Sequence, residues 1–182
     1  QKSRLSRGKV EKFIKQYHVD VSDCTKQHYD NFNDFFTRQR KRYVDQTGEG
    51  ELPAIADSKL LAMPIDENSR FEIKGVPYTV EELLENSELA EKFLGGYCLI
   101  FRLAPDDYHR YVYPDSGSRE QSVLIKGVLH TVNPIAADMK VYRRNTRCYQ
   151  LLHTEHFGDV LQMEVGALLV GKICNHQNAS AK

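Results

Sequence analysis

The sequence predicts an α+β domain, mainly β, in which an antiparallel β-sandwich or partly open barrel follows an N-terminal helical arm. Three observations predict it: short apolar runs separated by turn residues after Pro53, helical periodicity near the N-terminus, and a composition suited to a soluble globular domain. The chain has 182 residues, of which 41% are hydrophobic and 27% charged. We expect two parts, a basic helical arm over residues 1–44 and a β-rich core over residues 45–182.

The arm is predicted to begin with one amphipathic helix. Four apolar residues follow the i, i+3, i+4, i+7 spacing of a single helical face: Val10, Phe13, Ile14 and Tyr17. Ser6 is the expected N-cap of this helix. Residues 32–38, FNDFFTR, hold too many aromatic rings for a solvent-exposed loop, so we expect them to anchor the arm to the core.

The core is predicted to consist of strands with two short helical turns. Thr79 is followed three residues later by a Glu, which predicts a helix with a capping box, and Ser87 is the expected cap of a second turn. Residues 156–159 are expected to form the turn of a hairpin. The apolar runs predict strands over these residues: 54–64, 70–73, 97–103, 122–132, 140–142, 148–154, 159–165 and 168–173.

Charge and cysteine content exclude several classes of protein. The 25 Lys and Arg residues balance 25 Asp and Glu residues, which argues against a nucleic-acid-binding protein. The four Cys form no CxxC pair and the seven His form no HExxH motif, so we predict no metal site. No apolar run approaches the roughly 20 residues of a membrane span.

Basic residues are concentrated in the arm, for example over residues 38–42. A basic and aromatic arm of this kind is suited to the head groups of anionic lipids, although a solvated charged face explains the same residues. We therefore predict a cytoplasmic protein that contacts an anionic membrane surface peripherally.

Residues 102–110 hold the densest group of reactive side chains. They place two carboxylates, one His and two Arg at the end of a predicted strand. Such a group suits acid–base chemistry, because carboxylates orient and charge an imidazole, and it equally suits a structural cluster of salt bridges.

Two strings within these regions, FNDFFTR at 32–38 and DYHR at 107–110, are specific enough to suggest a family. Further short strings follow in the same order, namely IADS at 55–58, EIKG at 72–75, TVNP at 131–134, NTR at 145–147, VGA at 165–167 and VG at 170–171. In order and spacing the sequence resembles the phosphatidylserine decarboxylase family.

The resemblance implies a pyruvoyl-dependent decarboxylase that is made as a proenzyme. In that family a Ser in a Gly-Ser-Thr motif cleaves the chain before itself, which gives a β chain, an α chain and a covalent pyruvoyl group at the N-terminus of the α chain. The pyruvoyl ketone forms a Schiff base with phosphatidylserine and accepts electrons as CO2 leaves, so that phosphatidylethanolamine is released.

The resemblance also assigns roles to individual residues. Asp57 matches the acidic residue of the self-cleavage triad, and here Ser58 replaces the Gly that follows it in the family. His109 matches the His of DYHR, which lies near the substrate carboxylate and acts in proton transfer. We list the catalytic candidates as Asp57, His109 and His130.

His130 is included because of a departure from the family pattern. Many members carry a second His three residues after the first, as the base that activates the Ser, and this chain has Val112 there. His130 lies on a neighbouring predicted strand and is the expected substitute, although a His within an apolar strand is also typical of a core residue.

A second departure is that no Gly-Ser-Thr occurs in the 182 residues. We therefore expect the chain to be part of the β-chain region and to be inactive alone, with the α chain of the same precursor as its partner. Two other functions stay open: decarboxylation of a soluble amino acid, and non-catalytic binding of lipid head groups. A homo-oligomer is also left open.

Overall fold

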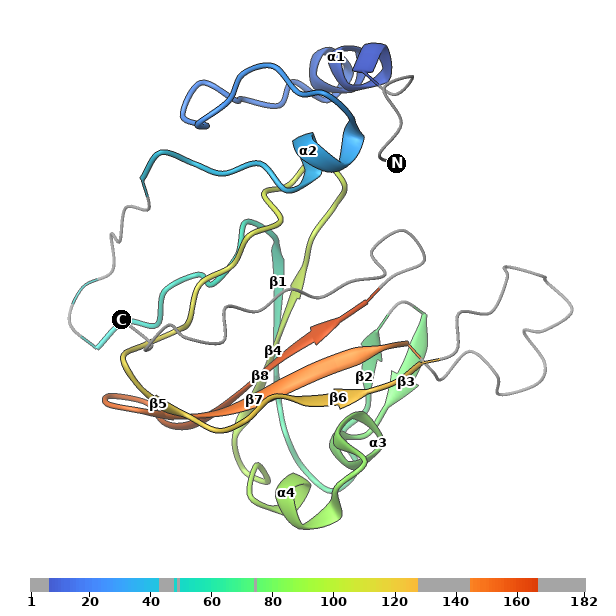
Figure 1. Cartoon of the computed structure of the whole chain (residues 1–182). Coiled ribbons are helices and arrows are strands. Elements are labelled where there is room, and N and C mark those ends of the chain that lie inside the picture. The colour runs from blue at the N-terminus through green and yellow to red at the C-terminus, as the bar shows by residue number, and fades with distance from the viewer. Residues whose placement is uncertain (1–6, 43–47, 49, 74, 128–144, 167–182) are drawn as a thin grey trace, which may run out of the picture. The chain divides into compact units, whose positions relative to one another are not determined.

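The computed structural model describes residues 7–42, 48, 50–73, 75–127 and 145–166 (Figure 1). These residues form helices and strands in the following order: α1 (Arg7–Tyr17), α2 (Phe32–Phe36), β1 (Lys59–Pro64), β2 (Phe71–Ile73), β3 (Val76–Tyr78), α3 (Val80–Leu84), α4 (Ser87–Glu91), β4 (Tyr97–Arg102), β5 (Gly117–Arg119), β6 (Val123–Ile125), β7 (Arg147–Thr154) and β8 (Gly158–Val165).

The strands form small open sheets. β7 pairs with β8 along one edge and with β5 and β6, one after the other, along its opposite edge, while β2 pairs with β3 and β1 pairs with β4. The pairings of β7 with its three neighbours and of β2 with β3 are antiparallel. The predicted α+β class, mainly β and antiparallel, is confirmed.

The chain divides into two compact units. The first comprises Gln1–Ala62 and Leu99–Pro114, and the second comprises Met63–Cys98 and Asp115–Lys182. The chain passes between them within β1, within β4 and after Pro114. The predicted boundary between an arm over residues 1–44 and a core over residues 45–182 stays a prediction.

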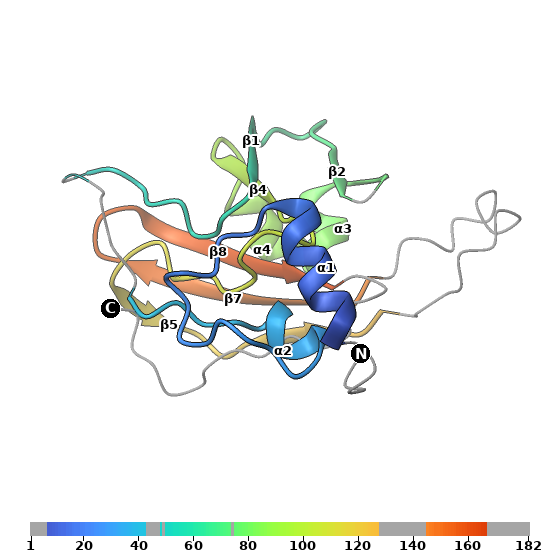
Figure 2. The ribbon, with the colours of Figure 1, turned by 90° about the horizontal axis from the view of Figure 1, so that it is seen from above.

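The first unit has its own small aromatic core beneath α1 and α2, which lie side by side in both views (Figures 1 and 2). Val10, Tyr29 and Phe35 are buried at its centre, and Phe35 is completely inaccessible to solvent. The ring of Phe13 meets Phe35 edge-on at 5.6 Å between centroids. Val10, Phe13 and Ile14 of the predicted helical face of α1 therefore pack in this core, whereas Tyr17 is 48% exposed.

The second unit is built on the β7–β8 hairpin. The two strands pair without interruption from Arg147 opposite Val165 to Thr154 opposite Gly158, which confirms the predicted hairpin but places its turn at residues 155–157 instead of 156–159. Gly117 of β5 lies opposite Thr154, where any Cβ would collide with the carbonyl of His153. The buried residues of this unit include Leu84, Ala90, Ile125 and Tyr149.

The helix caps match the prediction in one case and differ in the other. Thr79 and Glu82 form the predicted capping box, since the Thr79 hydroxyl accepts from the Glu82 N–H and the Glu82 carboxylate accepts from the Thr79 N–H. Helix α4 is capped by Asn86 rather than by Ser87, because the amide oxygen of Asn86 accepts from the Leu89 N–H at 3.0 Å. Both residue types cap well, so the pattern did not separate neighbouring positions.

Some strand predictions were too long, and two strands, β3 and β5, were missed. Residues 54–58 precede β1 as irregular chain, although the Ile55 carbonyl still accepts from the Val112 N–H at 3.0 Å. Strand β3 contains Pro77, a residue that argues against a strand except at an edge, and it pairs with β2 alone. The predicted strands at 140–142 and 168–173, and residues 128–132 of another, lie outside the described residues.

Among the described residues, no helix has both the length and the apolar character needed to cross a membrane.

Candidate functional site

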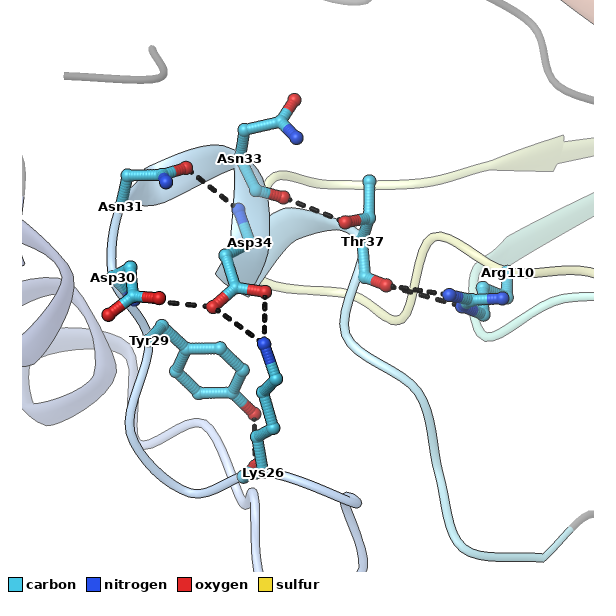
Figure 3. Close-up of polar contacts among 8 residues, drawn as sticks. All are labelled: Lys26, Tyr29, Asp30, Asn31, Asn33, Asp34, Thr37 and Arg110. Atoms are coloured by element: carbon cyan, nitrogen blue, oxygen red, sulfur yellow. Dashed lines mark hydrogen bonds and ion pairs between the residues drawn. The ribbon is translucent and has the colours of Figure 1, made fainter.

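Helix α2 presents the FNDFFTR string on a defined local scaffold. The Asn31 side chain caps the helix by accepting from the Asp34 N–H at 3.0 Å, and the Lys26 ammonium binds the Asp34 carboxylate at 3.0 Å (Figure 3). Just beyond the helix, the Thr37 hydroxyl donates to the Asn33 carbonyl. These contacts fix the direction in which the chain leaves α2 toward Arg38.

Two arginines join this string to the DYHR string. The Arg38 guanidinium donates through Nη2 to the carbonyls of Asp106 at 2.8 Å and Asp107 at 3.0 Å. In the reverse direction, the Arg110 guanidinium donates to the carbonyl of Thr37 at 3.1–3.2 Å, as Figure 3 shows, and to the carbonyl of Arg38 at 3.1 Å. We call this reciprocal pair of contacts the arginine clasp.

The two halves of the clasp differ in burial. Arg38 is only 6% exposed, and its guanidinium lies 4.6 Å from the centroid of the Phe35 ring. Arg110 is exposed. A buried guanidinium requires acceptors for its N–H groups, so the carbonyls of Asp106 and Asp107 are held firmly by Arg38.

The imidazole of His109 is fixed by two contacts beside the clasp. Its Nδ1 lies 2.9 Å from the Asp107 carbonyl, and its ring packs against Phe36 with 3.7 Å between ring centroids. A carbonyl oxygen accepts hydrogen bonds only, so Nδ1 carries the proton and neutral His109 has its lone pair on Nε2. Among the described residues, Nε2 has no hydrogen-bond partner.

Burial lowers the pKa of the His109 imidazole below its usual value, and the positive charge of Arg38 acts in the same direction. The hydrogen bond to the Asp107 carbonyl and the charges of Asp107 and Asp106 oppose this effect. His109 is thereby held as a half-buried neutral imidazole at neutral pH, a form that accepts a proton at Nε2 and passes it on.

The carboxylate of Asp57 is held by Arg40. Nη2 of Arg40 donates to Oδ2 of Asp57 at 2.6 Å, while Nε of the same guanidinium lies 2.9 Å from a carboxylate oxygen of Asp23. The guanidinium also lies 4.5 Å from the centroid of the Tyr108 ring. Asp57 is thus tied to the DYHR string through Arg40, and no described residue bonds its Oδ1.

In the structure, Val112, which stands where many family members have a second His, lies close to the segment that contains Asp57. The hydrogen bond from Val112 N–H to the Ile55 carbonyl places position 112 alongside a residue two before Asp57. No described His contacts the Asp57 carboxylate. His130 lies outside the described residues. The roles assigned to Asp57, His109 and His130 therefore stay predictions.

The sequence predicted an anchoring role for residues 32–38, a lipid-facing role for the basic residues 38–42 and a place for Arg110 in the reactive cluster, but it predicted none of the contacts made by Phe36, Arg38, Arg40 and Arg110. Three of them stand inside the FNDFFTR and DYHR strings, so their positions were visible but their contacts were not. The only available signal was that each string contains an Arg and an aromatic ring, which is typical of many surface segments.

Two further His residues lie in the second unit and form pairs with carboxylates. His153 Nδ1 lies 2.7 Å from the Asp159 carboxylate, which raises the pKa of the His153 imidazole. The His156 backbone N–H and Nδ1 both bond the Asp115 carboxylate. Both His side chains are exposed, so the pairs fit solvated contacts around the β7–β8 hairpin.

The arm shows which of its side chains remain available to a membrane. The rings of Phe32 and Phe35 pack within the first unit, whereas Lys9, Lys12 and Lys15 of α1 are exposed. The predicted membrane contact stays a prediction, and it rests on these lysines rather than on inserted aromatic rings.

Comparison with known proteins gives consistent results. The sequence model of the phosphatidylserine decarboxylase family matches residues 32–182. The phosphatidylserine decarboxylase proenzyme 2 of Clostridium acetobutylicum is 48% identical over 172 residues, which are 92% of this chain and 59% of that protein. The phosphatidylserine decarboxylase proenzyme of Clostridium novyi is 43% identical over 94% of this chain and 60% of its own length.

A third relative, the phosphatidylserine decarboxylase proenzyme of Clostridium perfringens, is 40% identical over 94% of this chain and 60% of its own length. The chain thus spans about three fifths of the length of the curated relatives it matches. The match covers both strings of the arginine clasp and nearly all of the chain. The chain therefore belongs to the phosphatidylserine decarboxylase family.

Proposed function

We propose that the complete protein containing this chain converts phosphatidylserine to phosphatidylethanolamine and CO2. Relatives that cover more than nine tenths of the chain are named as phosphatidylserine decarboxylase proenzymes, which supports the proposal. The structural observation that carries it is the His109 imidazole, half-buried, fixed at Nδ1 and without a described partner at Nε2. An imidazole in this state is suited to proton transfer.

The cofactor of the proposed reaction is a pyruvoyl group formed by self-cleavage of the precursor. Such a group supplies an electron sink for the charge that develops when a carboxylate leaves as CO2. The described residues fit such a group, because decarboxylation leaves a carbon that needs a proton and Nε2 of His109 is free to carry one. The 182 residues contain no Gly-Ser-Thr, so we propose that the chain is inactive without the α chain of the same precursor.

In this proposal His109 acts as the proton carrier. Nδ1 keeps its proton throughout, because this proton is hydrogen-bonded to the Asp107 carbonyl. Only Nε2 therefore exchanges protons with the substrate. Packing against Phe36 fixes the plane of the ring and shields one face from water. A lowered pKa makes the protonated imidazole a ready donor, which favours transfer to a basic carbon.

The function is tested by turnover of the complete protein on phosphatidylserine vesicles. We expect CO2 release by the parent and loss of at least about 100-fold in kcat for His109→Ala, because general acid–base groups contribute factors of this size. Free serine and aromatic amino acids serve as competing substrates. Near-normal turnover by His109→Ala would remove His109 from the mechanism, and preference for a free amino acid would replace the lipid substrate.

We also propose that Asp57 acts in self-cleavage, with its Oδ1, which no described residue bonds, available to orient an imidazole, and that His130 is the base that replaces the missing His at Val112. Asp57→Asn and His130→Ala are each expected to leave the complete protein as one chain on a denaturing gel. Asp23→Asn is the matched control, because it removes the other carboxylate bound to Arg40 without changing Asp57. Normal cleavage in Asp57→Asn would exclude Asp57 from the relay.

One observation favours a second function, the non-catalytic binding of phosphatidylserine head groups. Position 112 carries a Val that is unable to take a proton, although it lies beside the Asp57 segment. If the complete protein binds phosphatidylserine vesicles and neither cleaves itself nor releases CO2, this second function replaces the first.

A further inference from the structure

The Asp107 carbonyl is shared by two donors from different segments. Nη2 of Arg38 donates to it at 3.0 Å, and the imidazole Nδ1 of His109 lies 2.9 Å from it. A carbonyl oxygen has two lone pairs, so both hydrogen bonds form at once. One oxygen atom therefore links a buried arginine of the FNDFFTR string to the imidazole of the DYHR string.

This link constrains the imidazole in a specific way. Because Nη2 also donates to the Asp106 carbonyl at 2.8 Å, the Asp106–Asp107 peptide segment is held at two points. The held carbonyl fixes the acceptor that selects the Nδ1–H tautomer of His109. Packing against Phe36, two residues before Arg38, fixes the plane of the ring.

We propose that Arg38 is a positioning residue for His109, which selects the Nδ1–H tautomer and aims Nε2 by holding the Asp107 carbonyl. The inference rests on the proposed role of His109 as proton carrier. Through this link the segment that follows helix α2 becomes part of the reaction site, although it contributes no group that touches the substrate.

The arginine clasp supplies a matched control for a purely structural role. Arg110 joins the same two segments, but its guanidinium donates to the carbonyls of Thr37 and Arg38 and does not touch the Asp107 carbonyl. Replacing Arg110 loosens the contact between the strings and leaves the acceptor of His109 in place. Replacing the Arg38 side chain leaves the Arg110 contacts with the Thr37 and Arg38 carbonyls in place and removes the donor that holds the Asp107 carbonyl.

The test uses the complete protein labelled with nitrogen-15 at histidine, in the parent and in the Arg38→Met, Arg38→Lys and Arg110→Met variants. Imidazole nitrogen signals distinguish a protonated from an unprotonated nitrogen, and His109→Asn assigns the His109 signals by removing them. Turnover on phosphatidylserine vesicles is measured in parallel, as kcat and KM separately.

We expect one tautomer, with the proton on Nδ1, in the parent and in Arg110→Met. Both Arg38 variants are expected to show a mixture of tautomers, and kcat is expected to fall about 10- to 100-fold with little change in KM, since a misplaced catalytic group lowers the rate rather than binding. Arg38→Lys keeps the positive charge, so a mixture in this variant shows that fixed geometry, not charge, is needed.

A single Nδ1–H tautomer in both Arg38 variants would overturn the proposal. An Nε2–H tautomer in the parent would also overturn it, and that measurement does not depend on any variant being able to fold. If Arg110→Met loses the Nδ1–H tautomer to the same extent as the Arg38 variants, Arg38 only holds the two strings together and does not position His109. The proposed function fails separately, if the parent holds the Nδ1–H tautomer but releases no CO2.

Discussion

Opposing influences act on the proton of His109. Its burial against Phe36 removes water and favours the neutral ring, and the nearby Arg38 charge does the same. The carboxylates of Asp106 and Asp107 and the carbonyl at Nδ1 favour the protonated ring. The net result is a lowered pKa, so the imidazole is a neutral ring rather than a fixed cation at neutral pH.

This balance predicts how His109 affects stability with pH. The pKa of His109 is lowered in the folded state from its ordinary value of 6.5, so the unfolded chain binds more protons between the two values. The contribution of a neutral His109 to the free energy of unfolding is complete above pH 6.5. It is lost as the pH falls through the pKa that His109 has in the folded protein. The parent complete protein should therefore lose more stability than His109→Gln between about pH 7.5 and about pH 5.

Urea unfolding of both proteins at the two pH values measures the difference, and groups common to both proteins cancel. An equal loss of stability in the two proteins would show that burial does not disfavour the charged imidazole.

At the scale of the single residue, the sequence was informative about residue identity but not about contacts. His109 and Asp57 were found because DYHR and IADS resemble family strings. The contacts of Arg38 and Arg40 were not predicted, because their partners lie 68, 69 and 17 positions away, and no local pattern encodes a hydrogen bond to a distant backbone carbonyl. Tertiary contacts of this kind are set by packing, which sequence periodicity does not report.

Short elements depend on partners outside themselves. Helix α3 has only five residues, which are too few for a stable helix on its own. Its last backbone carbonyls need hydrogen-bond donors from outside the helix. Arg147 of β7 supplies them, with Nε 2.6 Å from the Leu83 carbonyl and Nη2 2.9 Å from the Glu82 carbonyl. The Arg147 side chain is only 3% exposed, so these bonds form away from water.

Loss of this anchor should be costly. We expect Arg147→Met to lower the free energy of unfolding by about 2–4 kcal/mol, because it leaves buried carbonyls without donors. Glu85→Gln is the matched control, since Glu85 pairs with the same guanidinium but is 64% exposed, and its loss should change stability by less than about 0.5 kcal/mol. Denaturant unfolding measures both, and equal effects would contradict the anchoring role.

The elements that the sequence predicted are those with a complete local signal. The β7–β8 hairpin combines two apolar runs with a turn around Gly158, and the capping box of Thr79 and Glu82 is a local pattern. Helix α2 was read only as an aromatic anchor, because five residues are too short for helical periodicity to show. Strand β3 was missed because Pro77 opposes a strand locally, whereas its pairing with β2 is decided by the hairpin as a whole.

At the scale of the molecule, the first unit unites segments that lie far apart in the sequence. Residues of Gln1–Ala62 and Leu99–Pro114 form it together, and the arginine clasp is one of the contacts that join them. The order of the family strings indicated that these segments belong to one protein family, but not that they meet. The second unit carries the β7–β8 hairpin and the buried cluster around Tyr149.

We propose that the complete protein matures by self-cleavage into a pyruvoyl-dependent decarboxylase. Because this chain spans about three fifths of its curated relatives, the measurement needs the complete protein. Its intact mass, with and without a carbonyl-reactive reagent, tests the claim most directly. We predict two chains whose masses sum to that of the precursor plus one water minus one ammonia, because forming the pyruvoyl ketone consumes water and releases ammonia, with the smaller chain blocked at its N-terminus and labelled by the reagent. A single unlabelled chain of precursor mass would contradict it.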